Sequence, residues 1–249
     1  MTDKEILTIA TDIGYMLLKH GAEVYRAEQS VIYICNSFGI TDVDVFAIPS
    51  SLVTTISREG EFITKTKRIL NPSVDLDKVR LLNNLSREIC EKEIEFCDIN
   101  NRIEEIKAVA CHGNALMILA FAMVSASFTI IFGGDILNGA ISFAIGIVLR
   151  LISQIFESNH ANMFLKITIC AFCASLIAVV LENIFPAVVQ STEIIAGSLM
   201  LLVPGLALVN CMRDFMARDY MSGVVKLAEA MMVALATALG VAVVLLCFY

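Results

Sequence analysis

The sequence predicts a mainly α-helical membrane protein. An N-terminal cytosolic α+β domain, residues 1–107, precedes five transmembrane helices within residues 108–249. First, 57% of the 249 residues are apolar and 17% are charged, whereas a soluble domain has about 45–50% apolar and about 25% charged residues. Second, 31 charged residues lie in residues 1–107 and 12 lie in residues 108–249. This distribution excludes a single soluble globule, a disordered chain and a secreted disulfide scaffold.

Charge and cysteine patterns exclude further classes. The net charge is −7 and the chain has no basic stripe and no Trp, which argues against nucleic-acid binding. Eight irregularly spaced cysteines indicate a reducing cytoplasm. Cys170 and Cys173 form a C-x-x-C pair without a second pair of ligands, and His20, His112 and His160 are scattered. We therefore predict no metal, no cofactor and no catalytic residue.

The N-terminal domain begins with two helical patterns. Residues 3–20 and 22–38 place apolar side chains at helical spacing. Gly21 and Gly39 follow these runs and predict the helix ends.

Strand-like runs come next, and they are rich in β-branched residues. They are residues 42–48, 52–57 and 61–69. Pro49-Ser50 and Glu59-Gly60 predict the turns between them. Asp75 predicts the N-cap of a helix that continues to Phe96, and a short charged helix from about Asn101 leads into the membrane.

Five later stretches are apolar and long enough to cross a bilayer, which takes about 20 residues for about 30 Å of hydrocarbon. We predict spans at about 114–132, 136–156, 163–184, 194–212 and 228–248. The cations after residue 108 are Arg150, Lys166, Arg213, Arg218 and Lys226. If the chain crosses the membrane five times, all five of these cations lie on the side of the N-terminal domain. The positive-inside rule therefore predicts a cytoplasmic N-terminus and an outside C-terminus in the cytoplasmic membrane.

The fourth predicted span contains Pro204-Gly205. Proline removes a backbone donor, and glycine permits an unwound backbone. In transporters such breaks expose carbonyls and helix ends that bind substrate or ions, whereas elsewhere they are ordinary packing kinks. Asn210 and Asp214 follow within the next turns and favour a binding role.

Three charged residues are further candidates. Asp214 near the end of a broken helix suits a coupling proton or a substrate ammonium group. Arg213 suits a two-pronged contact with a substrate carboxylate; the alternative for this segment is a solvated cytoplasmic loop. Arg150 lies about 9 Å from the inner end of the second span. It either snorkels to the headgroups or faces a cavity and selects anions.

Two regions carry a family resemblance, one in the N-terminal domain and one around the fourth predicted span. Residues 21–28 read Gly-Ala-Glu-Val-Tyr-Arg-Ala-Glu, and residues 44–50 read Asp-Val-Phe-Ala-Ile-Pro-Ser. Residues 197–205 read Gly-Ser-Leu-Met-Leu-Leu-Val-Pro-Gly and precede Asn210, Arg213-Asp214 and Ser222-Gly223. Together they resemble the threonine/serine exporter family over essentially the whole chain. Ser50 departs from the Pro-Thr expected in the family, but it keeps the hydroxyl group.

The resemblance implies the larger subunit of a split, gradient-driven exporter. Its partner is a small all-membrane subunit of the YjjB type, and a homo-oligomer is a further possibility. The implied substrates are threonine and serine, or a small dicarboxylate such as succinate. Asp214 is the implied coupling or binding carboxylate, Pro204 and Gly205 supply the break, and Asn210 adds a polar contact.

The N-terminal motif has two interpretations. Glu23 and Arg26 at helical spacing suit an exposed ion pair. The resemblance implies instead that Glu23, Arg26 and Glu28, with Ser50, dock onto the membrane part or contact solute. Two other functions stay open, namely a membrane-anchored hydrolase-like enzyme and a membrane-anchored sensor or regulatory protein.

Overall fold

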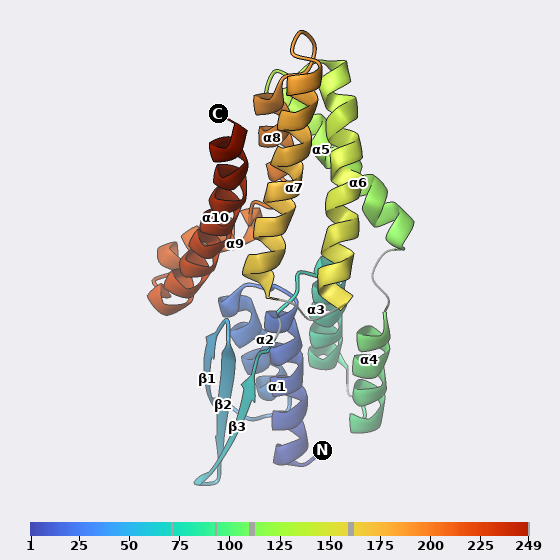
Figure 1. Ribbon diagram of the computed structural model, residues 1–249. Helices are drawn as coiled ribbons and strands as arrows, with labels where there is room; N and C mark the ends of the chain where they lie inside the picture. Colours follow the sequence, from blue (N-terminus) through green and yellow to red (C-terminus); the bar gives the residue numbers. More distant parts are fainter. Residues whose placement is uncertain (71, 93, 110–112, 159–161, 249) are drawn as a thin grey trace. The chain divides into compact units, whose positions relative to one another are not determined.

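The computed structural model describes residues 1–70, 72–92, 94–109, 113–158 and 162–248 and divides the chain into two compact units (Figure 1). Unit 1 comprises Met1–Cys111 and Asn210–Val225. Unit 2 comprises His112–Val209 and Lys226–Tyr249. Residues 210–225, from the second half of the sequence, therefore pack with the N-terminal segment.

Unit 1 begins with helices α1 (Asp3–Lys19) and α2 (Val24–Ser37). The Thr2 hydroxyl oxygen accepts the Glu5 N–H, and the Thr2 N–H donates in return to the Glu5 carboxylate, which satisfies two backbone donors at the start of α1. Gly21 and Gly39 adopt φ values of +90° and +79° after the two helices, a conformation that glycine reaches without steric cost. The predicted ends of both helices are confirmed.

Three antiparallel strands follow in the order β1-β2-β3: β1 (Asp42–Ile48), β2 (Ser51–Arg58) and β3 (Glu61–Arg68). The central strand alternates, because Leu52, Thr54 and Ile56 are buried and their neighbours are half-buried. Helix α1 covers this face. A Cβ atom added to Gly14 would lie 2.5 Å from a Val31 methyl carbon and 3.0 Å from a Leu52 methyl carbon, so α1 packs closely against α2 and β2.

Two further helices complete the N-terminal part of unit 1, α3 (Leu76–Glu91) and α4 (Phe96–Ala108). Asp75 caps α3 as predicted, with its side chain accepting the Lys78 N–H at 3.1 Å. The first helix ends earlier than the predicted Phe96, and the second begins earlier than Asn101. The extended backbone at Lys92 separates two helices whose apolar faces both reach the same core.

Unit 2 contains α5 (Asn114–Ile131), α6 (Ile136–Ser158), α7 (Met163–Ile184) and α8 (Ser191–Leu199). Helices α9 (Gly205–Met216) and α10 (Tyr220–Phe248) each have one part in unit 1 and one in unit 2. Among the described residues, four helical segments are long and apolar enough to cross a membrane. They are Asn114–Ile131, Ile136–Glu157, Met163–Ile184 and Tyr220–Phe248. The predicted fourth span, 194–212, is not a single helix but is divided between α8 and α9.

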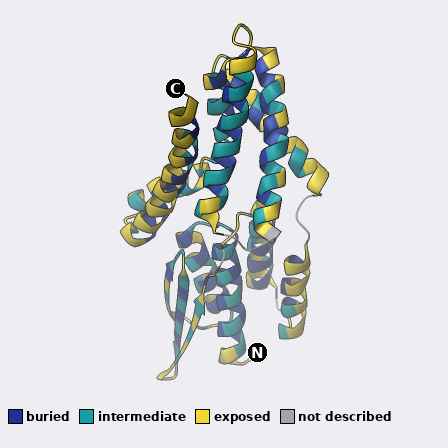
Figure 2. Cartoon of the chain, in the orientation of Figure 1, coloured by how far each residue is buried: buried dark blue, intermediate teal, exposed yellow. Residues whose placement is uncertain are grey.

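Small residues allow the helices of unit 2 to pack closely. A Cβ on Gly146 of α6 would lie 2.7 Å from the Ala122 Cα of α5, and one on Gly240 of α10 would lie 2.5 Å from the Thr168 carbonyl oxygen of α7. Figure 2 shows much of α10 as exposed. The exposed residues are predominantly apolar, as expected for a surface that meets lipid.

Candidate functional site

The helix break lies where the sequence predicted it. Helix α8 ends at Leu199 and α9 begins at Gly205. In the intervening segment the Leu202 N–H bonds the Leu199 carbonyl at 2.8 Å and the Gly205 N–H bonds the Val203 carbonyl at 2.9 Å. These short-range bonds replace the regular helical pattern. Pro204 has no N–H to continue the pattern, so the interruption leaves helix ends within an apolar segment.

A buried hydroxyl cluster lies in unit 2, and one of its members directly precedes the end of α8. The Ser125 hydroxyl of α5 donates to the Ser198 hydroxyl of α8 at 3.1 Å. Thr129 of α5 and Ser142 of α6 have hydroxyl oxygens 2.6 Å apart. All four side chains are fully buried. Gly197 makes the contact possible, because a Cβ there would overlap the Thr129 backbone and side chain.

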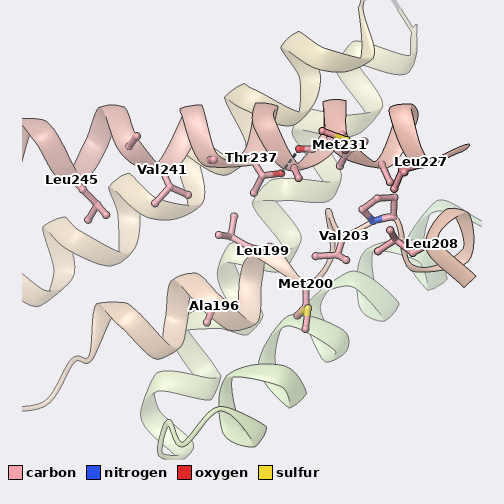
Figure 3. Close-up of a pocket in the computed structure, with 16 residues that line it drawn as sticks. Ala196, Leu199, Met200, Val203, Leu208, Leu227, Met231, Thr237, Val241 and Leu245 are labelled. Carbon is pink, nitrogen blue, oxygen red and sulfur yellow. Dashed lines mark hydrogen bonds between the residues drawn. The ribbon is translucent and has the colours of Figure 1, made fainter. Parts of the chain in front are cut away.

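An apolar groove of about 740 Å³ lies beside the break (Figure 3). Val203, Pro204 and Leu208 line one side, and α10 lines the other. Thr237 is the one polar side chain among its described lining residues, and its hydroxyl already donates to the Val233 carbonyl at 2.9 Å. A charged solute would lose its hydration there without receiving hydrogen bonds, so we do not assign the solute to this groove.

The candidate residues of α9 follow the break. Asn210 is half-buried, Arg213 is exposed, and Asp214 is buried with 2% of its surface accessible. The chain then turns at Arg218, whose φ is +66°. The Asp219 side chain accepts the Ser222 N–H at 3.2 Å, and this contact caps α10.

Within unit 1, a candidate residue of α9 contacts the N-terminal motif of residues 21–28. Glu23 forms an ion pair with Arg213, and its other carboxylate oxygen lies 2.9 Å from Arg26 Nε. The Arg26 Nε–H is directed at the Tyr25 hydroxyl oxygen, 3.1 Å away, so its contact with Glu23 is electrostatic rather than a hydrogen bond. The Glu23 side chain is 13% exposed. One carboxylate thus lies between two arginines that are far apart in the sequence.

Glu28 occupies a different position, at the free edge of β1. Its carboxylate accepts the Ala47 N–H at 2.8 Å, and among the described residues β1 pairs with β2 alone. Burial raises the pKa of Glu28, the Ala47 hydrogen bond lowers it, and the negative charge of Asp219 raises it, so that the net shift is upward. Glu28 and Asp219 are therefore neighbouring acids within unit 1.

Ser50 lies in the turn between β1 and β2 and is exposed. Its backbone carbonyl accepts the Ile69 N–H at 2.8 Å. The structure therefore gives Ser50 a turn position and a backbone role in the sheet.

Arg150 lies in unit 2 and pairs with Glu157 on the same helix. Sequence reasoning did not single out Glu157. The seven-residue spacing could have identified it, because residues two helical turns apart share a face.

The described residues contain no group of three His, Cys, Asp or Glu side chains that could hold a metal ion. His112 and His160 lie outside the described residues. Cys170 and Cys173 are free thiols on α7.

Comparison with known proteins gives two kinds of match. A family model described as "Putative threonine/serine exporter" matches residues 8–247. A protein named "Probable succinate transporter subunit YjjP" from Klebsiella aerogenes is 25% identical over 241 residues, which cover 96% of this chain and 92% of that protein. Its namesake from Escherichia coli (strain K12) is 22% identical over 97% of this chain and 94% of its own length.

A more distant relative is longer. "Pheromone-regulated membrane protein 10" from Kluyveromyces lactis is 23% identical over 90% of this chain, but the match covers only 24% of the yeast protein. No solved structure matches the chain.

Proposed function

The chain belongs to the family of putative threonine/serine exporters, and we propose that it is one subunit of a secondary exporter for small carboxylate-bearing solutes. The solutes are threonine and serine, or a small dicarboxylate such as succinate. The relatives named as succinate transporter subunits support the dicarboxylate, and the family description supports the amino acids. The driving force in this proposal is a proton gradient or another ion gradient.

We place a cytosolic α+β domain, residues 1–107, before a membrane domain that crosses the cytoplasmic membrane five times. The fourth crossing is the broken pair α8–α9. The grouping of residues 210–225 with unit 1 supports this count. With α5, α6 and α7 alone the chain would reach residues 210–225 on the side opposite the N-terminal domain. A crossing by α8–α9 returns it to that domain and leaves the C-terminus outside.

The observation that carries the function is the break in α8–α9 followed by Asp214, an acid with 2% of its surface accessible. Broken helices place helix ends and freed backbone groups where transporters bind substrate and ions, and buried acids in such proteins are typical proton or cation sites. In our proposal Pro204 and Gly205 form the break. Asp214 takes the coupling ion or substrate ammonium, and Asn210 adds a polar contact.

Arginines provide the complementary charge. Arg213 is held by Glu23 and would exchange this carboxylate for that of the solute. Arg26 contacts the same Glu23 and takes up the released charge. The Glu23–Arg213 pair thereby gives the N-terminal domain a direct part in transport, and the half-buried Glu28 keeps α2 fixed on β1.

A partner completes the path. The relatives are named as subunits, and an odd number of crossings suits half of a transporter built from paired repeats. We propose a small all-membrane partner of the YjjB type, and we assign the chain no enzymatic activity and no cofactor. Association of further copies of this chain within the membrane is part of the proposal.

The test is efflux of preloaded labelled threonine, serine and succinate from cells that express the chain with and without the proposed small all-membrane partner. Asp214→Asn is the informative variant, and Glu229→Asn on the exposed face of α10 is its matched control. We expect flux that needs both subunits and that falls at least tenfold in Asp214→Asn at equal membrane abundance. Absence of flux for all three solutes, with no binding to the purified complex, would favour a membrane-anchored sensor.

A further inference from the structure

Unit 1 has its charged cluster around Glu23, and unit 2 has another, which connects three helices. Arg150 Nη1 of α6 lies 3.3 Å from Glu157 Oε2, and Lys166 Nζ of α7 lies 3.5 Å from Glu157 Oε1. The Arg150 guanidinium carbon lies 5.5 Å from the centre of the Phe121 ring of α5. One carboxylate is thus shared by two cations, and the cluster carries a net charge of +1.

The packing of α5 on α6 fixes the arginine. Gly146 lies one turn before Arg150, and a Cβ there would lie 2.7 Å from the Phe121 carbonyl oxygen. This close approach brings the Phe121 ring beneath the guanidinium, where ring and cation attract each other. Arg150 is therefore held by the helix pair and not only by its ion pair.

The three charged side chains differ in exposure. The Arg150 side chain is 12% exposed, that of Lys166 is 25% exposed, and that of Glu157 is 51% exposed. The Arg150 Nε is buried and has no hydrogen-bond partner in the described part of the chain. A buried charged donor without an acceptor is costly. The Nε–H of Arg150 belongs to the guanidinium edge that binds carboxylates in a two-pronged contact. The cluster therefore has one unused donor and one uncompensated positive charge.

We propose that the Nε edge of Arg150 binds a carboxylate of the transported solute, and that Glu157 tunes the affinity of this site. The inference rests on the proposed function and adds Glu157 and Lys166 to it. With the solute bound, Arg150 faces the solute carboxylate and Lys166 faces Glu157, so two cations balance two anions. The neutral, loaded cluster is less costly to enclose within the membrane than the empty one.

Glu157 keeps the binding reversible. Its negative charge lowers the attraction of Arg150 and Lys166 for an incoming anion, and a transport site must bind its solute weakly enough to release it. Removal of this charge should tighten binding and slow release. A higher affinity together with a lower maximal rate therefore indicates that Glu157 tunes the binding, because loss of a purely structural residue would not raise the affinity.

The experiment measures the half-saturating solute concentration and the maximal rate of efflux for the complex, with labelled succinate and threonine as probes. For Glu157→Gln we expect a half-saturating concentration about five- to tenfold lower, the lower end of the range for coupled sites, together with a reduced maximal rate. Glu229→Gln, on the exposed face of α10, is the matched control and should change neither.

The arginine variants test the other half of the site. Arg150→Gln should raise the half-saturating concentration about 10- to 100-fold, as for loss of a charged hydrogen bond. Arg150→Lys should recover only part of this, because an ammonium group lacks the two-pronged edge. Lys166→Gln should weaken binding less than Arg150→Gln. Threoninamide, which lacks the carboxylate, should not compete with labelled threonine for efflux by any of these variants.

Three results would overturn the inference while flux, and with it the proposed exporter, is retained; the second would also remove the solute contact proposed for Arg213. The first is a half-saturating concentration that stays unchanged in both Glu157→Gln and Arg150→Gln, whether or not the maximal rate falls. It would show that the two side chains have a structural role only. Competition by threoninamide equal to that by threonine would exclude carboxylate recognition. Loss of bound phosphatidylglycerol in Arg150→Gln, by native mass spectrometry and without a change in solute affinity, would assign the cluster to a lipid phosphate. Failure of the proposed function itself would appear as absent flux in the wild type.

Discussion

The two units differ in the residues that they bury and expose. In unit 1, α1 presents Ile9, Ile13 and Leu17 to a core sealed from solvent, and its charges lie outside. In unit 2 the fully buried side chains include Ser125 and Thr129, whereas Leu246 is 84% exposed. The difference indicates two solvents. Water drives apolar residues inward in unit 1, but lipid gives unit 2 no such drive, so packing and interhelical hydrogen bonds hold its helices together.

The largest effect should come from the core of unit 1. Leu17→Ala removes a fully buried side chain, and we expect unit 1 to lose about 2–5 kcal/mol of stability, as is usual for such cavities. Hydrogen–deuterium exchange of the α1 amides in the full chain in detergent measures this loss. Leu246→Ala is the matched change in unit 2 and should leave exchange in its helix nearly unaltered. Equal effects of the two variants would contradict the comparison.

Close packing is the corresponding weak point of unit 2. Gly197→Ala would place a methyl group against the Thr129 backbone, which cannot move without shifting α5. We expect a cost of about 1–3 kcal/mol, in the range for overpacked sites, and less folded protein in the membrane. Fluorescence-detected size exclusion reports the folded fraction. Gly113→Ala, where a Cβ would meet nothing within 4 Å, should behave like the wild type.

The sequence predicted local structure well where one physical rule decides it. Helix α7 and strand β1 have the predicted bounds, because a long, mostly apolar run and a β-branched alternation each favour one structure. The division into α3 and α4 was predicted, but its position was not, because α3 ends at Glu91 rather than Phe96 and α4 begins at Phe96 rather than at about Asn101. Both helices have apolar faces directed at a shared core, and helical spacing alone does not show where the backbone must turn to let both reach it.

A smaller effect should come from the hydroxyl cluster. Ser198→Ala removes the acceptor of the Ser125 hydroxyl between α8 and α5. Hydrogen bonds between membrane helices contribute on average about 0.6 kcal/mol and at most about 1.7 kcal/mol, so we expect a loss in that range, measured as a small fall in the thermal midpoint in detergent. Ser175→Ala is the control, because its hydroxyl bonds the Ala171 carbonyl of its own helix at 2.8 Å. A larger loss in the control would exclude an interhelical role.

The candidate site was predictable in parts but not as an assembly. Pro204 marks the break, because its missing N–H is a property of the residue itself. The pairing of Glu23 with Arg213 joins positions 190 residues apart, and no local pattern encodes such a contact. The spacing to Arg150 could have identified Glu157, but its link to Lys166 is a different case. That link crosses from α6 to α7, and only the packing of the two helices shows it.

The smallest effect should be a pH dependence of unit 1 through Glu28. Burial and the charge of Asp219 raise its pKa above the ordinary 4.5, while the Ala47 N–H opposes the rise, and the net shift is upward. Because folded Glu28 holds its proton more tightly than unfolded Glu28, its contribution to stability is complete below pH 4.5 and is lost as pH rises through the raised pKa. Ionised Glu28 therefore weakens unit 1 at neutral pH.

Glu28→Gln isolates this contribution, because the amide oxygen still accepts the Ala47 N–H while the charge near Asp219 is gone. We expect exchange protection of α2 and β1 in the variant to fall less between pH 4.5 and 7 than in the wild type, and to exceed it slightly at pH 7. Asp219→Asn should give a weaker change of the same sign, since it removes the charge of Asp219 but leaves the burial of Glu28. A variant that is less stable than the wild type at pH 7 would mean that the ionised carboxylate is the better partner of Ala47. In that case the hydrogen bond at the edge of β1, rather than burial beside Asp219, governs Glu28.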